Sequence, residues 1–218
     1  MWGRIAGMSE ILKNTAKAFK QALATRAPKL LDSPRARSAA VLMPLWEDQG
    51  QAQVVFTKRT ESLPTHAGQI SFPGGATDPD DPDLAFTALR ETCEEIGVCL
   101  DDARVLVQLD QVVTVTNYLV TPFVGVLQPE VEFRPNPEEV ERLVVVPLAK
   151  VLDRAAYQPT EIDWQGMLLQ YEALSHNGDV IWGATGRILL NLLDRLGDSA
   201  ADIAATAQGA DLKRSGQC

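Results

Sequence analysis

The chain lacks long apolar runs and has few histidines, and both absences exclude whole classes of protein. No apolar stretch approaches the roughly 18 residues of a membrane-spanning helix, so stable insertion into a membrane is not expected. Arg4 is not followed by the continuous apolar core of a secretory signal. With only His66 and His176, a histidine-rich zinc site is not expected, and no motif supports a Ser-His-Asp triad.

Cysteine is also scarce. Cys93, Cys99 and Cys218 are odd in number and lack the spacing of a metal site, so a disulfide framework is not expected. Cys93 is predicted to be a small buried apolar residue rather than a nucleophile. This cysteine usage indicates a reducing, cytoplasmic setting.

The balance of charge is acidic, with 29 Asp and Glu against 20 Lys and Arg and a formal net charge of −9. It is also uneven, because residues 1–37 carry eight basic and two acidic side chains, whereas the remainder carries twelve basic and 27 acidic ones. So acidic a body argues against broad nucleic-acid binding, which requires a dominant basic patch. The basic segment could instead meet an acidic partner, a phosphate or a membrane surface.

Residues 1–37 are predicted to form a basic amphipathic helical arm and a connector. Apolar residues recur there at helical spacing, with lysines between them. We expect this helix to pack on the body of the protein or on a second subunit, which would make a homodimer, rather than on a membrane. Residues 25–37, which include two prolines, form the connector.

Residues 38–197 form one predicted domain, in which strands alternate with helices as in an α/β fold. A leucine-rich stripe that starts at Ile188 predicts its last helix. Residues 198–218 are rich in Ala, Asp, Gly and Ser and lack core-forming residues, so they are predicted to be a mobile C-terminal tail, with loose docking as the alternative. The expected strands cover residues 39–46, 53–59, 69–72, 105–115, 119–127, 143–146, 167–174 and 180–181.

Three glutamates follow a glycine turn near the middle of the chain. Gly74 and Gly75 form the turn, and Glu91, Glu94 and Glu95 lie within about 100° of one another on the next helix, on an open face opposite the face that is expected to be buried. At a spacing of about 6 Å and an effective dielectric of about 20, each pair would repel by roughly 3 kcal/mol. A hard divalent cation that prefers oxygen ligands relieves this repulsion, so the cluster predicts a Mg²⁺ site. A solvated acidic helix face is the alternative.

The two ends of this helix carry capping residues. Asp81 is expected to be the N-cap, with Pro82 at the first helical position, and Gly97 is expected to end the helix. Arg90 directly precedes the first glutamate. The turn, the capped helix and the Arg-Glu-x-x-Glu-Glu spacing together form a compound pattern that favours the metal site.

At these residues the chain resembles the Nudix hydrolase family, whose motif is G-x5-E-x7-R-E-U-x-E-E-x-G-U, with U an aliphatic residue. Residues 74–98, GGATDPDDPDLAFTALRETCEEIGV, match its Arg-Glu, Glu-Glu, Gly and final aliphatic positions. Fourteen residues rather than thirteen separate the turn from the Arg-Glu pair, Pro82 stands at the outlying Glu position, and Thr92 fills a usually aliphatic or small position. The resemblance extends over residues 38–197 and implies an α/β/α sandwich with a mixed β-sheet.

The insertion in the motif, with its Asp-rich turn, is similar to the branch of the family that hydrolyses coenzyme A. Residues 56–60 and 66–75, FTKRT and HAGQISFPGG, also resemble a segment of that branch, although Pro64 stands where a basic residue is usual. The resemblance implies hydrolysis of the diphosphate linkage of coenzyme A, or of its acyl and oxidised forms. The products would be 3′,5′-ADP and 4′-phosphopantetheine.

The chemistry of a diphosphate suggests roles for individual residues. Glu91 and Glu95 are the first expected ligands of Mg²⁺ or Mn²⁺ and Glu94 the third, while the family resemblance adds the carbonyl of Gly75. Arg90 is expected to fix Glu91 or Glu94 by its charge. A surface pair between Arg90 and Glu94 is the alternative, worth only about 0.3–0.5 kcal/mol.

The general base is not fixed by the spacing. Glu91, Glu94 and Glu139 are candidates. Glu139 is also a candidate for a further metal ligand, and a solvated loop residue is the alternative for it. Lys58 and Arg59, together with Gly74, are candidates for contact with the substrate phosphates. A solvated strand end is the alternative for the Lys-Arg pair.

Three functions fit these features. The first is the coenzyme A pyrophosphatase, and the second is a pyrophosphatase for another nucleoside diphosphate derivative such as ADP-ribose. The third is a domain that senses a nucleotide without hydrolysing it. The intact set of Glu91, Glu94 and Glu95 argues against the sensor, because a pure binder needs no metal-activated water.

Overall fold

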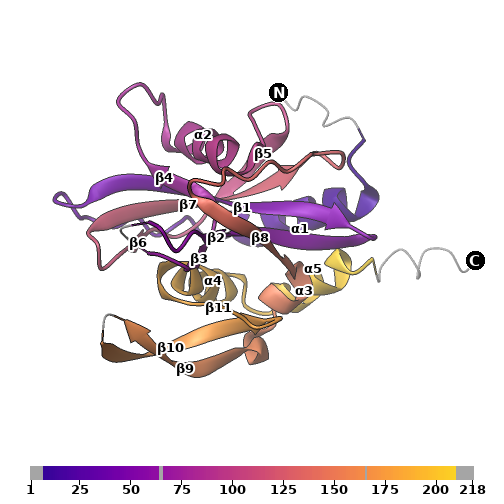
Figure 1. The fold of residues 1–218 in the computed structure, drawn as a ribbon. Coiled ribbons are helices and arrows are strands. Elements are labelled where there is room, and N and C mark those ends of the chain that lie inside the picture. Colours follow the sequence, from indigo (N-terminus) through magenta and orange to yellow (C-terminus); the bar gives the residue numbers. More distant parts are fainter. Residues whose placement is uncertain (1–6, 64–65, 165, 210–218) are drawn as a thin grey trace, which may run out of the picture.

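A computed structural model describes residues 7–63, 66–164 and 166–209 of the chain. Strands and helices alternate along it, as the sequence predicts, and the mixed sheet has helices on both faces (Figure 1). No helix in these described ranges is both long enough and apolar enough to cross a membrane. In chain order the elements are α1 (Glu10–Ala24), β1 (Arg37–Asp48), β2 (Gln51–Arg59), β3 (Ile70–Ser71), β4 (Gly74–Ala76), α2 (Leu84–Ile96), β5 (Ala103–Gln108), β6 (Val112–Val113), β7 (Tyr118–Leu127), β8 (Val140–Pro147), α3 (Leu148–Val151), the 3₁₀ turn η1 (Arg154–Ala156), β9 (Tyr157–Trp164), β10 (Met167–His176), β11 (Asp179–Ile181), α4 (Gly183–Leu196) and α5 (Ser199–Ala207).

The central sheet has the strand order β3-β2-β1-β7-β5, with β4 paired to β1, β6 to β7 and β8 to β2. Its middle pair, β1 and β7, is parallel and the other pairs are antiparallel, so the sheet is mixed. Eight consecutive residues of β7, Val120–Leu127, are buried, as expected for a strand covered on both faces. The α/β/α sandwich with a mixed sheet is confirmed.

The two faces of the central sheet support different helices. On one face, α2 covers a small apolar cluster that includes Ala40, Leu42 and Ile96. On the other face, α1, α4 and α5 cover a much larger core (Figure 1). Beyond α4 lies a second, antiparallel sheet of three strands in the order β11-β10-β9.

The predicted N-terminal helix is α1, and it packs on the body of the protein. Ser9 caps it by accepting a hydrogen bond from the Leu12 backbone, and Leu12, Phe19 and Leu23 are almost completely buried. The apolar face of α1 is buried against the rest of the same chain, so that face is not available to a second subunit. The connector is also fixed, since the backbone N–H of Lys29 donates to Asp110 at 3.0 Å.

Arg195 of α4 links the two ends of the described chain. Its Nη2 donates to the backbone carbonyls of Leu23 and Arg26, so the guanidinium caps the C-terminal end of α1. Its Nη1 lies 3.4 Å from Asp110 Oδ1, and the side chain is only 2% exposed. The prediction of one strand over residues 105–115 is wrong for this reason, because Asp110 and Gln111 contact the connector, and Asp110 also contacts Arg195, between β5 and β6.

The prediction of a mobile tail over residues 198–218 is wrong for its first part. Residues Ser199–Ala207 form α5, which buries Ala200, Ile203 and Ala207 in the large core. Alanine side chains allow this helix to lie close to its neighbours, so an alanine-rich segment with one isoleucine is sufficient to dock. Residues 210–218 lie outside the described part of the chain.

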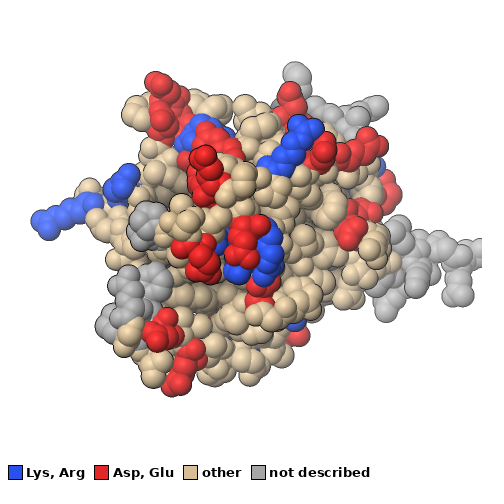
Figure 2. Space-filling model, in the orientation of Figure 1, with Lys and Arg blue, Asp and Glu red and all other residues tan. Residues whose placement is uncertain are grey.

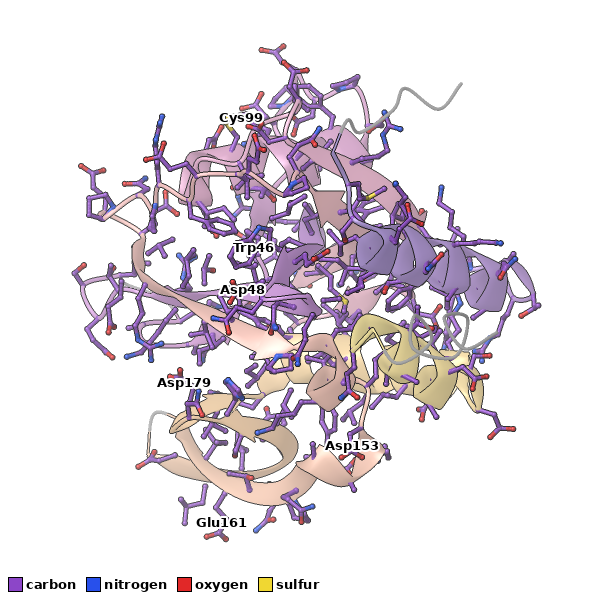
Figure 3. The ribbon with its side chains drawn as sticks, turned by 90° about the vertical axis from the view of Figure 1, so that its right-hand side faces the viewer. Trp46, Asp48, Cys99, Asp153, Glu161 and Asp179 are labelled. Carbon is purple, nitrogen blue, oxygen red and sulfur yellow. A yellow bond between two sulfur atoms is a disulfide. The ribbon has the colours of Figure 1, made fainter. Side chains whose placement is uncertain are left out.

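Strand β9 was not among the predicted strands. It forms a long hairpin with β10, and a turn at Asn177 and Gly178 joins β10 to β11. Figure 3 places Glu161 of β9 and Cys99, just after α2, at opposite ends of the molecule. The hairpin sheet is thus remote from the helix that carries the three glutamates.

Candidate active site

The glycine turn brings the start of the candidate site against β1. Strand β4 pairs with β1 through Ala40↔Gly75 and Val41↔Gly74. Gly74 has φ 152°, and a Cβ there would lie 2.6 Å from the Val41 Cα, so no larger residue fits. This packing explains the glycine, while its predicted contact with substrate remains a prediction.

Helix α2 begins two residues later than its sequence predicts. The N-cap is Asp83, whose Oδ1 accepts a hydrogen bond from the Phe86 backbone at 2.8 Å, so the assignment of Asp81 as the cap and Pro82 as the first helical residue is wrong. Asp81 instead turns its carboxylate toward the helix, where it accepts from the Thr87 hydroxyl at 2.7 Å. Gly97 ends the helix as predicted, with φ 75° and its N–H donating to the Cys93 carbonyl.

Arg90 is the centre of a network of carboxylates beside the turn. Its guanidinium lies 2.9 Å from Asp81, 2.8 Å from Glu91 and 3.2 Å from Glu94, and it also donates to the carbonyl of Ala76. Hydrogen bonding to Arg90 holds the pKa of Asp81 well below its usual range. Arg90 therefore fixes both glutamates at once and ties the start of the helix to β4, which is more than a surface pair does.

The three glutamates have very different surroundings, and the prediction that they share one open face is wrong for Glu95. The side chain of Glu94 is 56% exposed, that of Glu91 17% and that of Glu95 only 3%. Glu95 faces the sheet because α2 packs on β1 and β4, and the side chains of Thr57 and Arg59 on the adjacent strand β2 reach its carboxyl group. The acidic side chains that do reach the surface intermingle with basic ones above the region of α2 (Figure 2).

Glu95 is a buried carboxyl with one cation beside it. The Thr57 hydroxyl donates to its Oε2 at 3.3 Å, and Arg59 Nη1 lies 3.7 Å from its Oε1. Burial raises the pKa of Glu95 to about 8, opposed by the charge of Arg59 and aided by the charges of Glu139 and Glu91. Thr57 was not predicted as a site residue, although the period-two alternation of β2 places it on the same side as Arg59.

Glu91 lies against the second glycine of the turn. A Cβ at Gly75 would lie 2.7 Å from Oε1 of Glu91, so the missing side chain makes the space that this carboxylate occupies. Burial raises the pKa of Glu91, Arg90 opposes this shift, and the charges of Glu94 and Glu139 raise the pKa further. Glu91 and Gly75 are thus direct neighbours, while their roles as metal ligands stay predictions.

Glu139 comes into the site on a loop that is hydrogen-bonded to the end of α2. The Asn136 N–H donates to the Glu95 carbonyl and the Arg134 N–H to the Ile96 carbonyl, both at 2.8 Å. The Thr60 N–H donates to the carbonyl of Glu139 at 3.0 Å. Half-buried and close enough to raise the pKa of both Glu91 and Glu95, Glu139 is more than a solvated loop residue.

Lys58 and Arg59 point in different directions, so the structure separates two residues that the sequence grouped. Lys58 Nζ lies 3.0 Å from Glu141 of the neighbouring strand β8. Arg59 faces α2 instead, and its Nε is buried without a hydrogen-bond partner in the described structure. Only Arg59 therefore directs its charge toward the carboxylates.

These residues fit a divalent cation by their chemistry. Within the described ranges, no three His, Cys, Asp or Glu side chains already converge on one point. The protein instead holds Glu91 through Arg90 and Glu95 through Thr57 and Arg59. Burial and neighbouring negative charges raise the pKa of Glu91 and of Glu95. A hard divalent cation prefers such oxygen ligands and would stabilise their charged forms.

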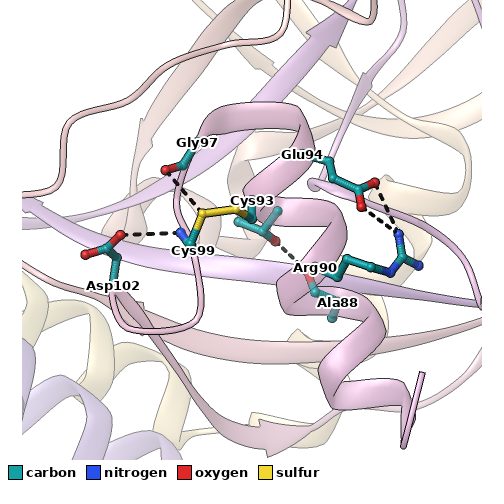
Figure 4. The surroundings of a disulfide bond; sticks show 8 residues. Ala88, Arg90, Cys93, Glu94, Gly97, Cys99 and Asp102 are labelled. Carbon is teal, nitrogen blue, oxygen red and sulfur yellow. Dashed lines mark hydrogen bonds and ion pairs between the residues drawn. A yellow bond between two sulfur atoms is a disulfide. The ribbon is translucent and has the colours of Figure 1, made fainter. Parts of the chain in front are cut away.

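The end of α2 carries a feature that contradicts the sequence prediction. Cys93 and Cys99 form a disulfide bond, with their Cα atoms 4.4 Å apart (Figure 4). The prediction failed because spacing along the chain hides the reversal at Gly97, which folds Cys99 back beside the last turn of the helix. Cys93 is half-buried rather than a buried apolar residue.

The chain is similar to a known protein family and to several named proteins. Residues 36–164 match the family model described as the NUDIX domain. The protein named uncharacterized Nudix hydrolase NudL from Photorhabdus laumondii is 36% identical over 169 residues, which cover 78% of this chain and 89% of that protein. The protein of the same name from Yersinia pestis is 35% identical over 160 residues, which cover 73% of this chain and 80% of that protein.

Two solved structures are also similar. The Nudix hydrolase RenU from M. smegmatis has a TM-score of 0.46 at 16% identity and covers 84% of this chain and 89% of its own. The Ap4A hydrolase from C. elegans has a TM-score of 0.44 at 20% identity and covers 50% of this chain and 80% of its own. Since the family model matches more than half of the chain, and both NudL relatives are more than one-third identical to it, the protein belongs to the Nudix hydrolases, a family of pyrophosphohydrolases that act on nucleoside diphosphate derivatives.

Proposed function

We propose that the protein is a pyrophosphatase that splits coenzyme A, or its acyl and oxidised forms, into 3′,5′-ADP and 4′-phosphopantetheine. Nudix enzymes generally use divalent metal ions, and we propose Mg²⁺ or Mn²⁺ here. Glu91, Glu95 and Glu94 would hold the ion, with the carbonyl of Gly75. The observation that carries the proposal is the buried Glu95, placed beside Glu91 and Glu139 and next to Arg59.

A bound divalent cation would supply charge to neutralise the diphosphate oxygens and would acidify a water molecule. The protein's own residues do the remaining work. Arg90 holds Glu91 and Glu94 in fixed orientations, so that they need not reorganise when substrate arrives. Arg59 offers a guanidinium that suits phosphate oxygens and that lacks a hydrogen-bond partner at its Nε.

Hydrolysis then needs one proton acceptor. The oxygen of water adds to one phosphorus atom, the bond from that phosphorus to the bridging oxygen breaks, and the bridging oxygen leaves with the electron pair. The proton of the water passes to a carboxylate. Among the candidates, Glu139 is half-buried and is not part of the Arg90 network, so we propose it as the acceptor ahead of Glu91 and Glu94.

The choice of coenzyme A rests on the resemblance of residues 56–60 and 66–75 to that branch of the family. In the structure these two segments adjoin each other beside the carboxylates. Thr57 pairs with Ser71, and the Arg59 N–H donates to the Gln69 carbonyl at 2.9 Å. The rings of Phe56 and Phe72 stack with centroids 4.9 Å apart, which fixes the approach to the glycine turn. The segment that resembles the coenzyme A branch therefore forms part of the wall next to Glu95.

A substrate panel tests this proposal. Purified protein with Mg²⁺ or Mn²⁺ is incubated with coenzyme A, ADP-ribose, NADH and nucleoside triphosphates, and the products are separated by chromatography. We expect 3′,5′-ADP and 4′-phosphopantetheine from coenzyme A at the highest kcat/KM. If ADP-ribose is cleaved at a higher kcat/KM than coenzyme A, ADP-ribose becomes the assigned substrate. Binding without cleavage of any compound would favour a nucleotide sensor.

We also propose that this activity is cytoplasmic. Its proposed substrates are multiply charged phosphate esters, which do not cross a lipid bilayer unaided because burying a charge in hydrocarbon is costly. Fractionation of cells that produce the protein, followed by the coenzyme A assay on each fraction, tests the location. Activity confined to an extracytoplasmic fraction would contradict it.

A further inference from the structure

The disulfide between Cys93 and Cys99 lies on the same helical turn as the candidate metal ligands. Cys93 stands two residues after Glu91 and two before Glu95. Figure 4 shows the sulfur bridge on one side of α2 and the pair of Arg90 and Glu94 on the other. A covalent bond at this position acts directly on the backbone that carries the carboxylates.

The disulfide encloses the cap that ends α2. Inside the loop that it closes, the Gly97 N–H donates to the Cys93 carbonyl at 2.9 Å, and Gly97 adopts φ 75°. A Cβ at Gly97 would lie 2.8 Å from the Cβ of Arg134, so the cap is packed directly on the loop that leads to Glu139. The end of the helix is thus held between the disulfide on one side and this loop on the other.

The same loop transmits the position of the cap to the site. Arg134 and Asn136 donate backbone hydrogen bonds to the carbonyls of Ile96 and Glu95, the last two residues of α2. A shift of the last helical turn therefore moves Glu95 itself, and it moves Glu139 through the hydrogen-bonded loop. Glu95 and Glu139 are both among the carboxyl groups of the candidate active site.

Neither cysteine of the bond is fully buried. Cys93 and Cys99 are both half-buried, and the adjacent Leu100 is 50% exposed. Cys99 begins a short turn in which the Asp102 N–H donates to its carbonyl at 2.9 Å, on the outside of the sheet. A disulfide of this kind in a cytoplasmic protein responds to the surrounding redox conditions, because that compartment keeps thiols reduced.

We propose that Cys93 and Cys99 form a redox switch that sets the activity of the site through the end of α2. In the oxidised form the bond holds the cap, and with it Glu95 and Glu139, in place. A dithiol reductant attacks one sulfur, the S–S bond breaks, and the two cysteines take up two electrons and two protons while the dithiol becomes a disulfide. The reduced form has a looser helix end and lower activity. This inference rests on the proposed pyrophosphatase function for its activity readout.

The test compares the oxidised and the dithiothreitol-reduced full-length protein. Thiol titration under denaturing conditions should count one free thiol, Cys218, before reduction and three after it. On reduction we expect kcat/KM to fall roughly tenfold and the thermal midpoint to fall by about 5 °C. Amide hydrogen exchange should become faster in residues 93–99 and 134–139, which a bond without influence on the loop would not cause.

Matched variants complete the test. Cys218→Ser should keep the full response to reductant, whereas Cys93→Ser with Cys99→Ser should resemble the reduced protein under all conditions. Three free thiols before reduction, or unchanged kcat/KM and exchange after the bond is broken, would overturn the switch. If no compound of the panel is hydrolysed, the proposed function fails separately. The affinity for Mn²⁺, measured by calorimetry in both redox states, then replaces kcat/KM, and an equal affinity would overturn the switch.

Discussion

The two faces of the central sheet differ in size and in polarity. The face under α1, α4 and α5 is apolar and large, and its polar exceptions, such as Arg195, serve to join helices. The face under α2 has a small apolar cluster and several ionisable side chains close together, including the buried Glu95. Buried charge lowers stability unless it is paired. The large apolar core therefore supplies stability that offsets the cost of the polar groups buried under α2.

The strongest test of this division removes the carboxylates. Glu91→Gln and Glu95→Gln should each lower kcat by about a thousandfold, because each removes a ligand of the catalytic cation. Stability should not fall, since a neutral amide of nearly the same shape replaces a carboxyl group whose pKa is raised by burial. Glu138→Gln, on an exposed neighbour of Glu139, is the matched control and should leave kcat unchanged. Near-normal turnover in both site variants would reject the assigned ligands.

The opposite face should respond in the opposite way. Phe19→Ala removes a fully buried ring from the large core and should lower the free energy of unfolding by about 3–5 kcal/mol. Lys13→Ala, on the exposed side of the same helix, should change it by less than about 0.5 kcal/mol. Denaturant titration measures both. A large loss of kcat in folded Phe19→Ala protein would show that the two faces are not independent.

The neighbours Lys58 and Arg59 sharpen the comparison within one strand. Arg59→Ala should raise KM about tenfold, because Arg59 points toward the carboxylates and the proposed phosphate position. Lys58→Ala breaks only the pair with Glu141 on the other side of β2 and should leave KM nearly unchanged. Steady-state kinetics on the preferred substrate measure both variants. Equal effects would mean that the direction of the side chain does not matter.

The smallest expected effect is a dependence of stability on pH. Burial raises the pKa of Glu95 to about 8 in the folded protein, whereas a glutamate in an unfolded chain has a pKa of about 4.3. The folded state therefore keeps a proton that the unfolded state releases, and this contribution to stability is full below about pH 4 and lost as pH rises through about 8. Without metal, the thermal midpoint should fall by a few degrees from about pH 6 to about pH 8.5. In Glu95→Gln the fall should be smaller, and identical curves would contradict the buried carboxyl.

Local patterns were enough to predict the glycine turn, the end of α2 at Gly97 and most strands of the sheet. They also grouped the glutamates with Arg90 on one helix. The same patterns could not show which flank of the helix faces the sheet, so they left Glu95 exposed. That choice depends on how α2 packs on β1 and β4, which brings Glu95 beside Thr57 of the adjacent strand β2, 38 residues away in sequence.

Other errors share one cause, which is contact between segments distant in sequence or reversed in direction. Asp81 has the residue type of an N-cap, but the side chain of Arg90 draws it into the network instead. Cys99 returns to Cys93 only because the chain reverses at Gly97. The alanine-rich residues of α5 become part of a core only beside α1 and α3. Composition does not contain this information.

The position of Arg195 has a practical consequence for anyone who shortens the chain. The family match spans residues 36–164 and so omits α1, α4 and α5, which supply much of the larger core. A fragment cut to those limits would uncover one whole side of the sheet and lose the guanidinium that fastens the first helix to the last ones. The length of polypeptide that the family model matches is therefore shorter than the length that builds the larger core.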